Sequence, residues 1–236
     1  MTLTSVSAQP LPKAVQISEM LIREIAAGHL ADGARLPTER QMARDLGIAV
    51  GTLRRALAIL EEQGLLKRIQ GSGNYIRAKR DIRSVYSFFR LELAEGGGLP
   101  SADVLEVLRL RKPQDVPDIG DSEWAHRIRR LRSLSGRPVA YEEIWLDFRF
   151  CDYLKAKDLN ESLYVHYKEK LGLIISRVED RIGVSTLPDW QTVSLSLPAC
   201  TSCGYVERIG TAQDGTDAEY SRTWFDHTAA RYTVRR

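Results

Sequence analysis

The sequence predicts an α+β protein with an N-terminal winged helix-turn-helix domain followed by a C-terminal antiparallel-sheet domain with flanking helices. Two short helical stretches and a glycine-rich hairpin between residues 36 and 76 predict the first domain. Strand-length segments joined by hairpin turns after residue 101 predict the second domain. Positive charge is concentrated in the first domain, because residues 1–80 hold 12 Lys and Arg against 7 Asp and Glu, whereas residues 81–236 hold 22 against 24.

Composition is typical of a globular protein. The chain has 236 residues, 43% of them hydrophobic and 28% charged, which suffices for two domains with separate cores. No apolar run reaches the roughly 20 residues of a membrane span. The N-terminus lacks the basic start and long apolar segment of a signal peptide, so we expect a cytoplasmic protein without a membrane partner. We divide the chain into a disordered tail (1–9), a DNA-binding domain (10–78), a linker (79–90) and a C-terminal domain (91–236).

Three helices are predicted in the first domain. The first spans 13–27 and ends before Gly28, with Ile17, Met20, Leu21 and Ile25 on one face. The second begins after Thr38, which forms a capping box with Gln41, and ends near Gly47. The third spans 49–63, with its apolar stripe directed to the core. Its first turns carry Thr52, Arg54 and Arg55 off that stripe, toward a DNA groove.

A hairpin follows the helices. Strands at 65–69 and 75–77 flank the segment 70–74, whose glycines allow close approach to a phosphate or a minor groove. A small helical module without nucleic acid is the alternative interpretation. The joint presence of the cap, the turn glycine, the arginine-bearing helix and the glycine-rich hairpin argues against that alternative.

This stretch resembles the winged-helix domain of the GntR family of bacterial transcriptional regulators. The motifs that carry the resemblance are Leu36–Arg40, Leu46–Gly47, Thr52–Leu57, Leu60–Glu61, Gly64–Leu66 and Gly71–Gly73. The resemblance implies DNA contacts from Arg35, Thr38, Arg40, Thr52, Arg54, Arg55, Gln70, Gly71, Ser72 and Gly73. Two positions depart from the family pattern: Ala49 replaces the usual Ser or Thr cap, and Val50 replaces an arginine that often reads guanine. The operator is therefore expected to differ at that base pair, with Arg40 or Arg55 reading more of it.

The second domain is predicted to contain six strands and two helices. Two hairpin turns are expected, at Ser135–Arg137 and at Asp214–Gly215. The predicted strands are 104–111, 124–134, 138–146, 174–184, 205–212 and 218–225, and the predicted helices are 159–171 and 187–197.

Charged residues lie between apolar ones on one predicted sheet face. Arg130 and Arg132 share a face because side chains alternate along a strand. A three-residue loop at 135–137 would place Glu142 opposite Arg130 on that face. Two guanidiniums with one carboxylate would leave a positive pocket suited to an anionic ligand. The alternative is a solvated face on which the arginines merely pair with Glu142, and periodicity does not decide between the two.

Three further polar positions allow both structural and functional readings. Ser162 opens a predicted helix, whose free amides would welcome an anion, but the simpler reading is an ordinary N-cap. Glu219 and Arg222 on the last predicted strand could equally be surface residues.

The second half resembles the UTRA effector-binding domain of the HutC subfamily, which shares the chorismate lyase fold. The resemblance runs from about residue 90 to the C-terminus on Arg130–Arg132, Gly136–Val139, Glu142, Leu146, Ser162–Tyr164, Gly172, Asp214–Gly215 and Glu219–Arg222. In relatives that bind sugar phosphates, matching residues line the pocket. The resemblance thus implies ligand binding by Arg130, Arg132, Glu142, Ser162, Tyr164, Glu219 and Arg222.

The cysteine pattern does not indicate a metal site, and a redox role for the Cys200–Cys203 pair is the lesser alternative to two small residues in a loop. The three cysteines are Cys151, Cys200 and Cys203, and the lone Cys200–Cys203 pair has no partner pair to complete a zinc site. We therefore predict no metal, no cofactor and no catalytic residue.

The leading hypothesis is a sequence-specific transcriptional regulator, a repressor that acts as a homodimer on an operator in double-stranded DNA and is released by a small anionic metabolite. Two alternatives are a lyase-type enzyme in the second domain, for which no catalytic constellation appears, and an architectural DNA binder without a ligand.

Overall fold

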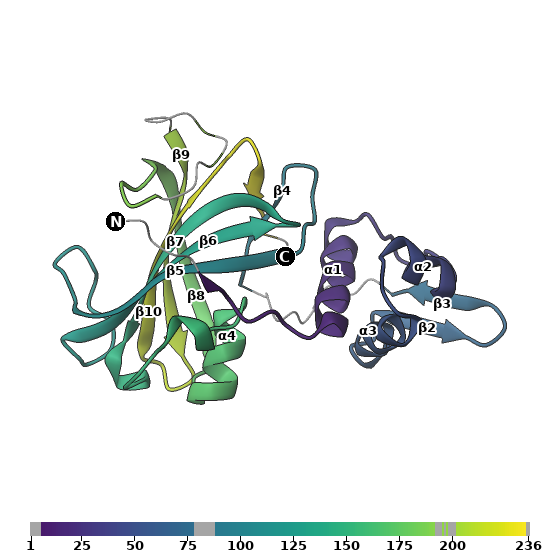
Figure 1. Ribbon diagram of the computed structural model, residues 1–236, viewed down its shortest axis with the longest axis horizontal. Coiled ribbons are helices and arrows are strands. Elements are labelled where there is room, and N and C mark those ends of the chain that lie inside the picture. Colours follow the sequence, from purple (N-terminus) through teal and green to yellow (C-terminus); the bar gives the residue numbers. More distant parts are fainter. Residues whose placement is uncertain (1–5, 78–87, 192–194, 196, 198–201, 235–236) are drawn as a thin grey trace. The chain divides into compact units, whose positions relative to one another are not determined.

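A computed structural model of the chain describes residues 6–77, 88–191, 195, 197 and 202–234 (Figure 1). It consists of two compact units. Pro10–Leu99 form the first unit together with the C-terminal residues from Tyr232, and Pro100–Arg231 form the second with the N-terminal residues up to Gln9. Within the ranges just given, no helix is both long and apolar enough to cross a membrane.

The first unit contains the predicted winged helix-turn-helix. Its helices are α1 (Lys13–Ala27), α2 (Glu39–Asp45) and α3 (Val50–Glu62), and its strands are β2 (Leu66–Ile69), β3 (Gly73–Ile76) and β4 (Leu91–Leu93). Helix α1 ends at Gly28, where a φ of 84° requires the left-handed conformation that glycine adopts without strain. The helix boundaries agree with the prediction to within two residues at either end.

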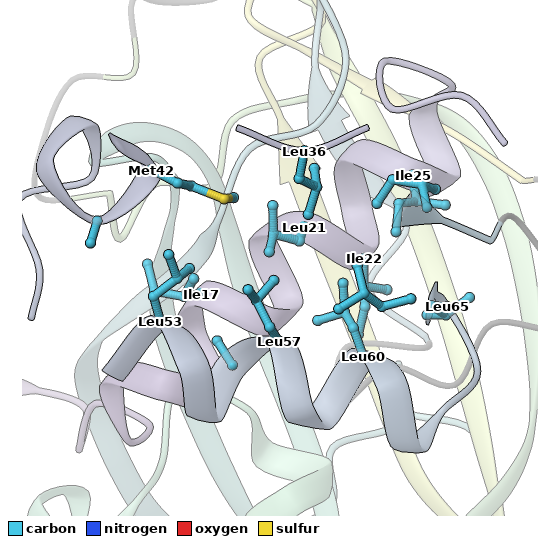
Figure 2. Close-up of a cluster of buried hydrophobic side chains, with 14 residues drawn as sticks. Ile17, Leu21, Ile22, Ile25, Leu36, Met42, Leu53, Leu57, Leu60 and Leu65 are labelled. Carbon is cyan, nitrogen blue, oxygen red and sulfur yellow. The ribbon is translucent and has the colours of Figure 1, made fainter. Parts of the chain in front are cut away.

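One apolar core holds α1 and α3 together (Figure 2). In that view the labelled side chains of α1 and α3 point toward one another, and Leu36, Met42 and Leu65 close the cluster from the flanking segments. Leu53 and Leu60 of α3 are completely buried. Burial of this side of α3 fixes which of its residues face outward.

Residues 88–99 pack with the first unit rather than with the sheet. Arg23 of α1, only 7% exposed, donates from Nε to the Gly98 carbonyl oxygen at 2.8 Å and from Nη2 to that of Leu91. Its guanidinium also lies 5.6 Å from the centroid of the Phe89 ring. These contacts compensate the burial of a cation and keep residues 91–99, which we assigned to the C-terminal domain, beside α1. Most of the predicted linker lies outside the described residues.

The second unit is built on one antiparallel sheet of seven strands in the order β1-β5-β6-β7-β10-β9-β8. Its strands are β1 (Val6–Ser7), β5 (Pro100–Arg111), β6 (Trp124–Leu134), β7 (Arg137–Asp147), β8 (Ile175–Thr186), β9 (Ser202–Ala212) and β10 (Asp217–Phe225); β11 (Ala230–Tyr232) follows. All six predicted strands are present. Val6 and Ser7, assigned to a disordered tail, instead pair with Val104 and Asp103 of β5.

The helices of the second unit are short and differ from the prediction. They are η1 (Phe148–Phe150), η2 (Ala156–Asp158), α4 (Leu163–His166) and η3 (Tyr167–Leu171). The helix predicted within 159–171, with its start near Ser162, is formed by α4 and η3 from Leu163 to Leu171. The predicted helix at 187–197 was wrong for the residues described there. Leu195 and Leu197 are both buried in one cluster with Tyr141, a spacing of two that a helical face does not provide.

The β6–β7 hairpin reaches the predicted pairing by another route. Its turn has two residues, Ser135 and Gly136, both with positive φ, rather than the three that we predicted. Such a turn alone would place Arg130 opposite Tyr141. A bulge at Val139, between the pairs Arg132–Ala140 and Ser133–Pro138, shifts the register by one residue. Arg130 therefore lies opposite Glu142, as predicted.

Candidate functional sites

Helix α3 presents its arginines outward. Arg54 and Arg55 are exposed and Thr52 is half-buried, whereas Leu53 and Leu57 face the core. The Arg54 guanidinium donates from Nε to Oε2 of Glu39 at 2.7 Å. With 64% of its side chain exposed, Arg54 remains accessible to a phosphate or a base edge. Ala49 begins the helix without a side-chain cap, as its identity predicts.

Thr38 begins α2 with half of the predicted capping box. Its hydroxyl oxygen accepts from the Gln41 amide at 3.3 Å. The Gln41 side chain instead donates to Oδ1 of Asp45 at 2.6 Å, so the reciprocal bond is replaced by a contact along the helix. Arg40, in the first turn of α2, is exposed.

The wing brings Arg35 close to its glycine-rich tip. Arg35 forms an isolated antiparallel bridge with Tyr75 of β3. A Cβ on Gly73 would stand 3.2 Å from Nε of Arg35, so the absence of a side chain there makes room for the guanidinium. Gln70 and Gly71 at the tip are exposed, and the hydroxyls of Ser72 and Tyr75 share a hydrogen bond of 2.7 Å. The structure thus places Arg35 beside the tip residues.

Sequence reasoning missed Arg68 on β2. Its Nε lies 2.8 Å from a Glu61 carboxylate oxygen, its Nη1 lies 3.7 Å from Glu39, and its Nη2 donates to the Arg54 carbonyl oxygen at 3.4 Å. Glu39 therefore organises two arginines, Arg54 and Arg68. The basic pair Lys67–Arg68 in a strand beside the recognition helix was the available signal.

In the second unit, the predicted ion pair is buried in the sheet. Arg130 is 5% exposed and Glu142 is 9% exposed. Arg130 donates to Oε2 of Glu142 from Nε at 3.1 Å and from Nη2 at 2.6 Å. Arg132 has Nε 3.9 Å from Oε1 of Glu142, and its Nη1 donates to the Glu161 carbonyl oxygen at 2.8 Å. The alternative of a solvated face is thus excluded, since these side chains are buried, although the pairing with Glu142 that it also expected is present.

A second acid joins the same face of the sheet. Glu219 of β10 accepts from the Tyr164 hydroxyl at 2.9 Å and from the Tyr167 hydroxyl at 2.7 Å. On β9, Arg208 bonds both carboxylate oxygens of Asp180, at 2.5 and 2.9 Å. Tyr167 and Arg208 were missed, although Tyr167 follows Tyr164 at helical spacing. We call Arg130, Arg132, Glu142, Asp180, Arg208 and Glu219 the buried charged face.

The two glutamates of the buried charged face have opposite pKa shifts. Burial alone would raise the pKa of Glu142, but the positive charges of Arg130, Arg132 and Arg208 hold it below its ordinary value. Burial raises the pKa of Glu219, and the hydrogen bonds from Tyr167 and Tyr164 only partly oppose this. When Glu219 is protonated, three guanidiniums face two carboxylates, and the face carries surplus positive charge.

Stability should depend on pH with opposite signs at these two groups. Because the pKa of Glu142 is lowered, its contribution is present above its ordinary value of 4.5 and is lost as pH falls through the folded value. Because the pKa of Glu219 is raised from 4.5, its contribution is full below that value and is lost as pH rises through the folded value. We expect Glu142→Gln to reduce the loss of Tm as pH falls below 4.5, and Glu219→Gln to reduce the loss of Tm as pH rises above 4.5.

Calorimetry between about pH 3 and pH 7 measures both losses of Tm. Glu123→Gln is the matched control, since the side chain of Glu123 is 71% exposed. An unchanged dependence of Tm on pH in both variants would contradict these assignments.

The two remaining predicted ligand residues are Ser162 and Arg222, and Ser162 lies at the start of a helix as predicted. Ser162 is buried at the N-cap position of α4, and its side chain makes no capping bond to the helix. It directly follows Glu161, whose carbonyl oxygen both arginines of β6 contact. Arg222 lies opposite Glu143, whereas Thr223 lies opposite Glu142. Since paired residues share a side, Arg222 is on the other face of the sheet, where it bonds Asp115 at 2.8 Å, and the structure does not bring it together with Arg130 and Glu142.

The two cysteines that the structure describes, Cys151 and Cys203, are free thiols. Cys203 is buried, and its Sγ donates to the Ser185 carbonyl oxygen at 3.2 Å. Cys200 lies outside the described residues. Among the residues that the structure places, no group of three or more His, Cys, Asp or Glu side chains could hold a metal ion.

A winged-helix unit with outward arginines and a separate sheet unit with a buried charged face define a DNA-binding regulator with an effector domain. Residues 13–76 match the model for bacterial regulatory proteins of the gntR family, and residues 95–231 match the UTRA domain. The chain belongs to the GntR family of transcriptional regulators, in the group that carries a UTRA effector domain.

Several characterised relatives are similar over nearly their whole length. The HTH-type transcriptional regulator SmoD of Agrobacterium fabrum is 57% identical over 95% of this chain and 96% of its own. The mannosyl-D-glycerate transport/metabolism system repressor MngR of Escherichia coli is 29% identical over 93% of each chain, and the HTH-type transcriptional repressor NagR of Bacillus subtilis is 25% identical over 95% and 93%. All three relatives are named as regulators or repressors.

Solved structures support the fold. The possible transcriptional regulator YydK from Bacillus subtilis superposes with a TM-score of 0.56 at 20% identity, covering 96% of this chain and all (100%) of that one. The ligand-binding domain of a GntR-family regulator from Bordetella bronchiseptica gives a TM-score of 0.54 at 20% identity, covering 61% and 94%.

Proposed function

We propose that this regulator is a cytoplasmic repressor of the HutC type, which binds operator DNA as a homodimer and is released by a small anionic metabolite. The repressor role is supported by the names of MngR and NagR. The operator contacts are assigned to α2, α3 and the wing, because Arg35, Arg40, Arg54 and Arg55 are exposed there. A dimer would present two such helices to half-sites about one helical turn apart.

The observation that carries the effector proposal is the buried charged face. Arg130 and Arg132 are at most 5% exposed and both reach the carbonyl oxygen of Glu161, at the start of the segment that forms α4. Guanidiniums held in this way match the paired oxygens of a carboxylate, phosphate or sulfonate. The hydroxyls of Tyr164 and Tyr167 can donate hydrogen bonds to the hydroxyl groups of a polyol or sugar and accept hydrogen bonds from them, and the Glu219 carboxylate can accept hydrogen bonds from the same groups. The effector class is therefore a small hydroxylated anion.

Selection from a random duplex library by the full chain tests the DNA-binding half of the proposal. One near-palindromic sequence should emerge, and binding to it should fall steeply with salt. Selection of no sequence, with equal binding to all duplexes, would favour the architectural alternative.

Arg54→Ala should weaken binding to the selected operator by about 1–3 kcal/mol, since one guanidinium contact to DNA is lost. Gel-shift titration measures the change. The control is Arg149→Ala, which removes an arginine of the second unit whose side chain is 42% exposed. If both variants bind like the wild type, α3 is not the recognition element.

A further inference from the structure

Helix α3 begins with side chains that carry no hydrogen-bonding group. Ala49 occupies the N-cap position without a side-chain bond to the helix, and Gly51 follows in the first turn. Both residues are exposed, whereas Val50 between them packs against the apolar core. In a helix-turn-helix, the N-terminal residues of the recognition helix contact the base edges. We call Ala49, Val50 and Gly51 the apolar first turn, and this is the part of α3 that is placed to read bases.

The fold does not require a glycine at position 51. Gly51 is the only glycine within a helix of the described residues, and a helix disfavours glycine relative to alanine. Its backbone is helical and has no positive φ. A Cβ at this position would meet no atom within 4 Å. Alanine would therefore fit the folded chain, and the open space outside Gly51 is available to a binding partner.

The charged groups of α3 begin one turn later. Arg54 donates from Nε to Oε2 of Glu39 at 2.7 Å, and Arg55 donates from Nε to the Gly51 carbonyl oxygen at 3.4 Å. Both arginines are exposed. Guanidiniums suit the phosphates that position a protein on the duplex. The apolar first turn is thereby left to contact the base itself.

We propose that the apolar first turn reads thymine through its methyl group, and that Gly51 determines specificity because it leaves room for that methyl group. The thymine methyl is the apolar group that bases present in the major groove. The polar edge of guanine, adenine or cytosine would lose hydrogen bonds to water against Ala49 and Gly51 without gaining any in return. This inference rests on the proposed function, since it needs an operator that α3 contacts.

Replacement of single thymines by deoxyuridine in the selected operator tests the DNA side, because only a methyl group is removed. At one thymine in a half-site, the replacement should weaken binding of the full chain by about fourfold, as expected for one buried methyl group. Exchange of that T·A pair for C·G should also weaken binding, and 5-methylcytosine in place of the cytosine should recover about fourfold. Fluorescence anisotropy measures each Kd. Equal binding with thymine and uracil at every position would overturn the inference.

Gly51→Ala tests the protein side through two readouts that should not move together. Operator binding should weaken by about tenfold, which is similar to the effect of one mismatched base pair. The Tm should stay the same or rise, because alanine favours a helix and its Cβ would meet no atom within 4 Å. Uracil at the sensitive position should not weaken binding of Gly51→Ala any further, since the methyl contact is already lost.

Ala58→Leu is the matched control for added bulk. Ala58 is exposed and lies seven residues beyond Gly51, on the same side of α3 but two turns further along. This variant should bind the operator like the wild type. A Gly51→Ala chain that binds like the wild type, or that loses Tm together with operator binding, would overturn the role given to Gly51.

The remaining outcomes separate this inference from a phosphate contact and from the proposed function. If Gly51→Ala weakens binding to the operator and to random duplexes equally, and no position is sensitive to uracil, the space outside Gly51 receives a phosphate and thymine reading is refuted. A chain that binds one operator without regard to its thymine methyl groups refutes the inference alone. A chain that ignores duplex DNA of every sequence refutes the proposed function, and the inference with it.

Discussion

Arg130→Ala is expected to lower the free energy of unfolding of the sheet unit by about 3–5 kcal/mol, because it leaves a buried carboxylate without its main cation. Glu142 accepts both bonds from Arg130 on a single oxygen and is only 9% exposed. Urea unfolding followed by tryptophan fluorescence measures the loss, since Trp145 and Trp224 are buried in this unit.

Two controls accompany that variant. Arg149→Ala removes an exposed arginine and should cost less than about 1 kcal/mol. Arg130→Met combined with Glu142→Leu removes both charges and should recover most of the lost stability. A cost for Arg130→Ala as small as that of the exposed control would show that water reaches Glu142 in the folded protein.

Arg132→Met is expected to abolish the response to the effector while operator binding persists. The side chain is 2% exposed, and Glu142 keeps its two bonds from Arg130, so the variant should fold. Loss of a buried guanidinium that faces an anion costs about 2–5 kcal/mol of binding free energy, which is roughly 30-fold or more. A thermal-shift screen of phosphorylated sugars, amino acids and other small acids identifies a ligand for the wild type, and the same ligand is then titrated into the variant.

Arg222→Met is the matched control for the effector response. Arg222 lies on the other face of the sheet, bonded to Asp115, so its loss should leave ligand binding intact. If Arg132→Met responds normally and Arg222→Met does not, the effector binds on the face opposite to the one proposed.

The first unit could be predicted from sequence because its signals are local. The spacing of Leu53, Leu57 and Leu60 fixes the buried side of α3, and Thr38 and Gly47 fix the ends of α2. Even there, the Gln41 side chain donates to Asp45 and not to the start of the helix, because both hydrogen bonds were within its reach. Local pattern gives the element and leaves the choice of bond open.

The site in the second unit was only partly predictable because its partners are distant in the chain. Strand β7 ends at Asp147 and pairs with β10, which begins only at Asp217, whereas β10 and β9 form a hairpin. The register of those pairs decides that Arg208 joins the buried charged face and that Arg222 does not. Glu219 and Arg222 are three positions apart on one strand, so their side chains point to opposite faces of the sheet. The sequence alone does not show which of the two residues shares a face with Arg130.

The bulge at Val139 makes the β6–β7 hairpin tolerant of a change in length. Val139 is the extra residue of this bulge: Pro138 pairs with Ser133 and Ala140 pairs with Arg132, so Val139 between them has no partner on β6. Its deletion would straighten the ladder and still leave Arg130 across from Glu142, whereas an insertion between Ala140 and Glu142 would send the carboxylate to the opposite side. A homologue that lacks one residue at this point is therefore expected to have a hairpin without the bulge and to keep the ion pair. The missing residue is no sign that effector binding has been lost.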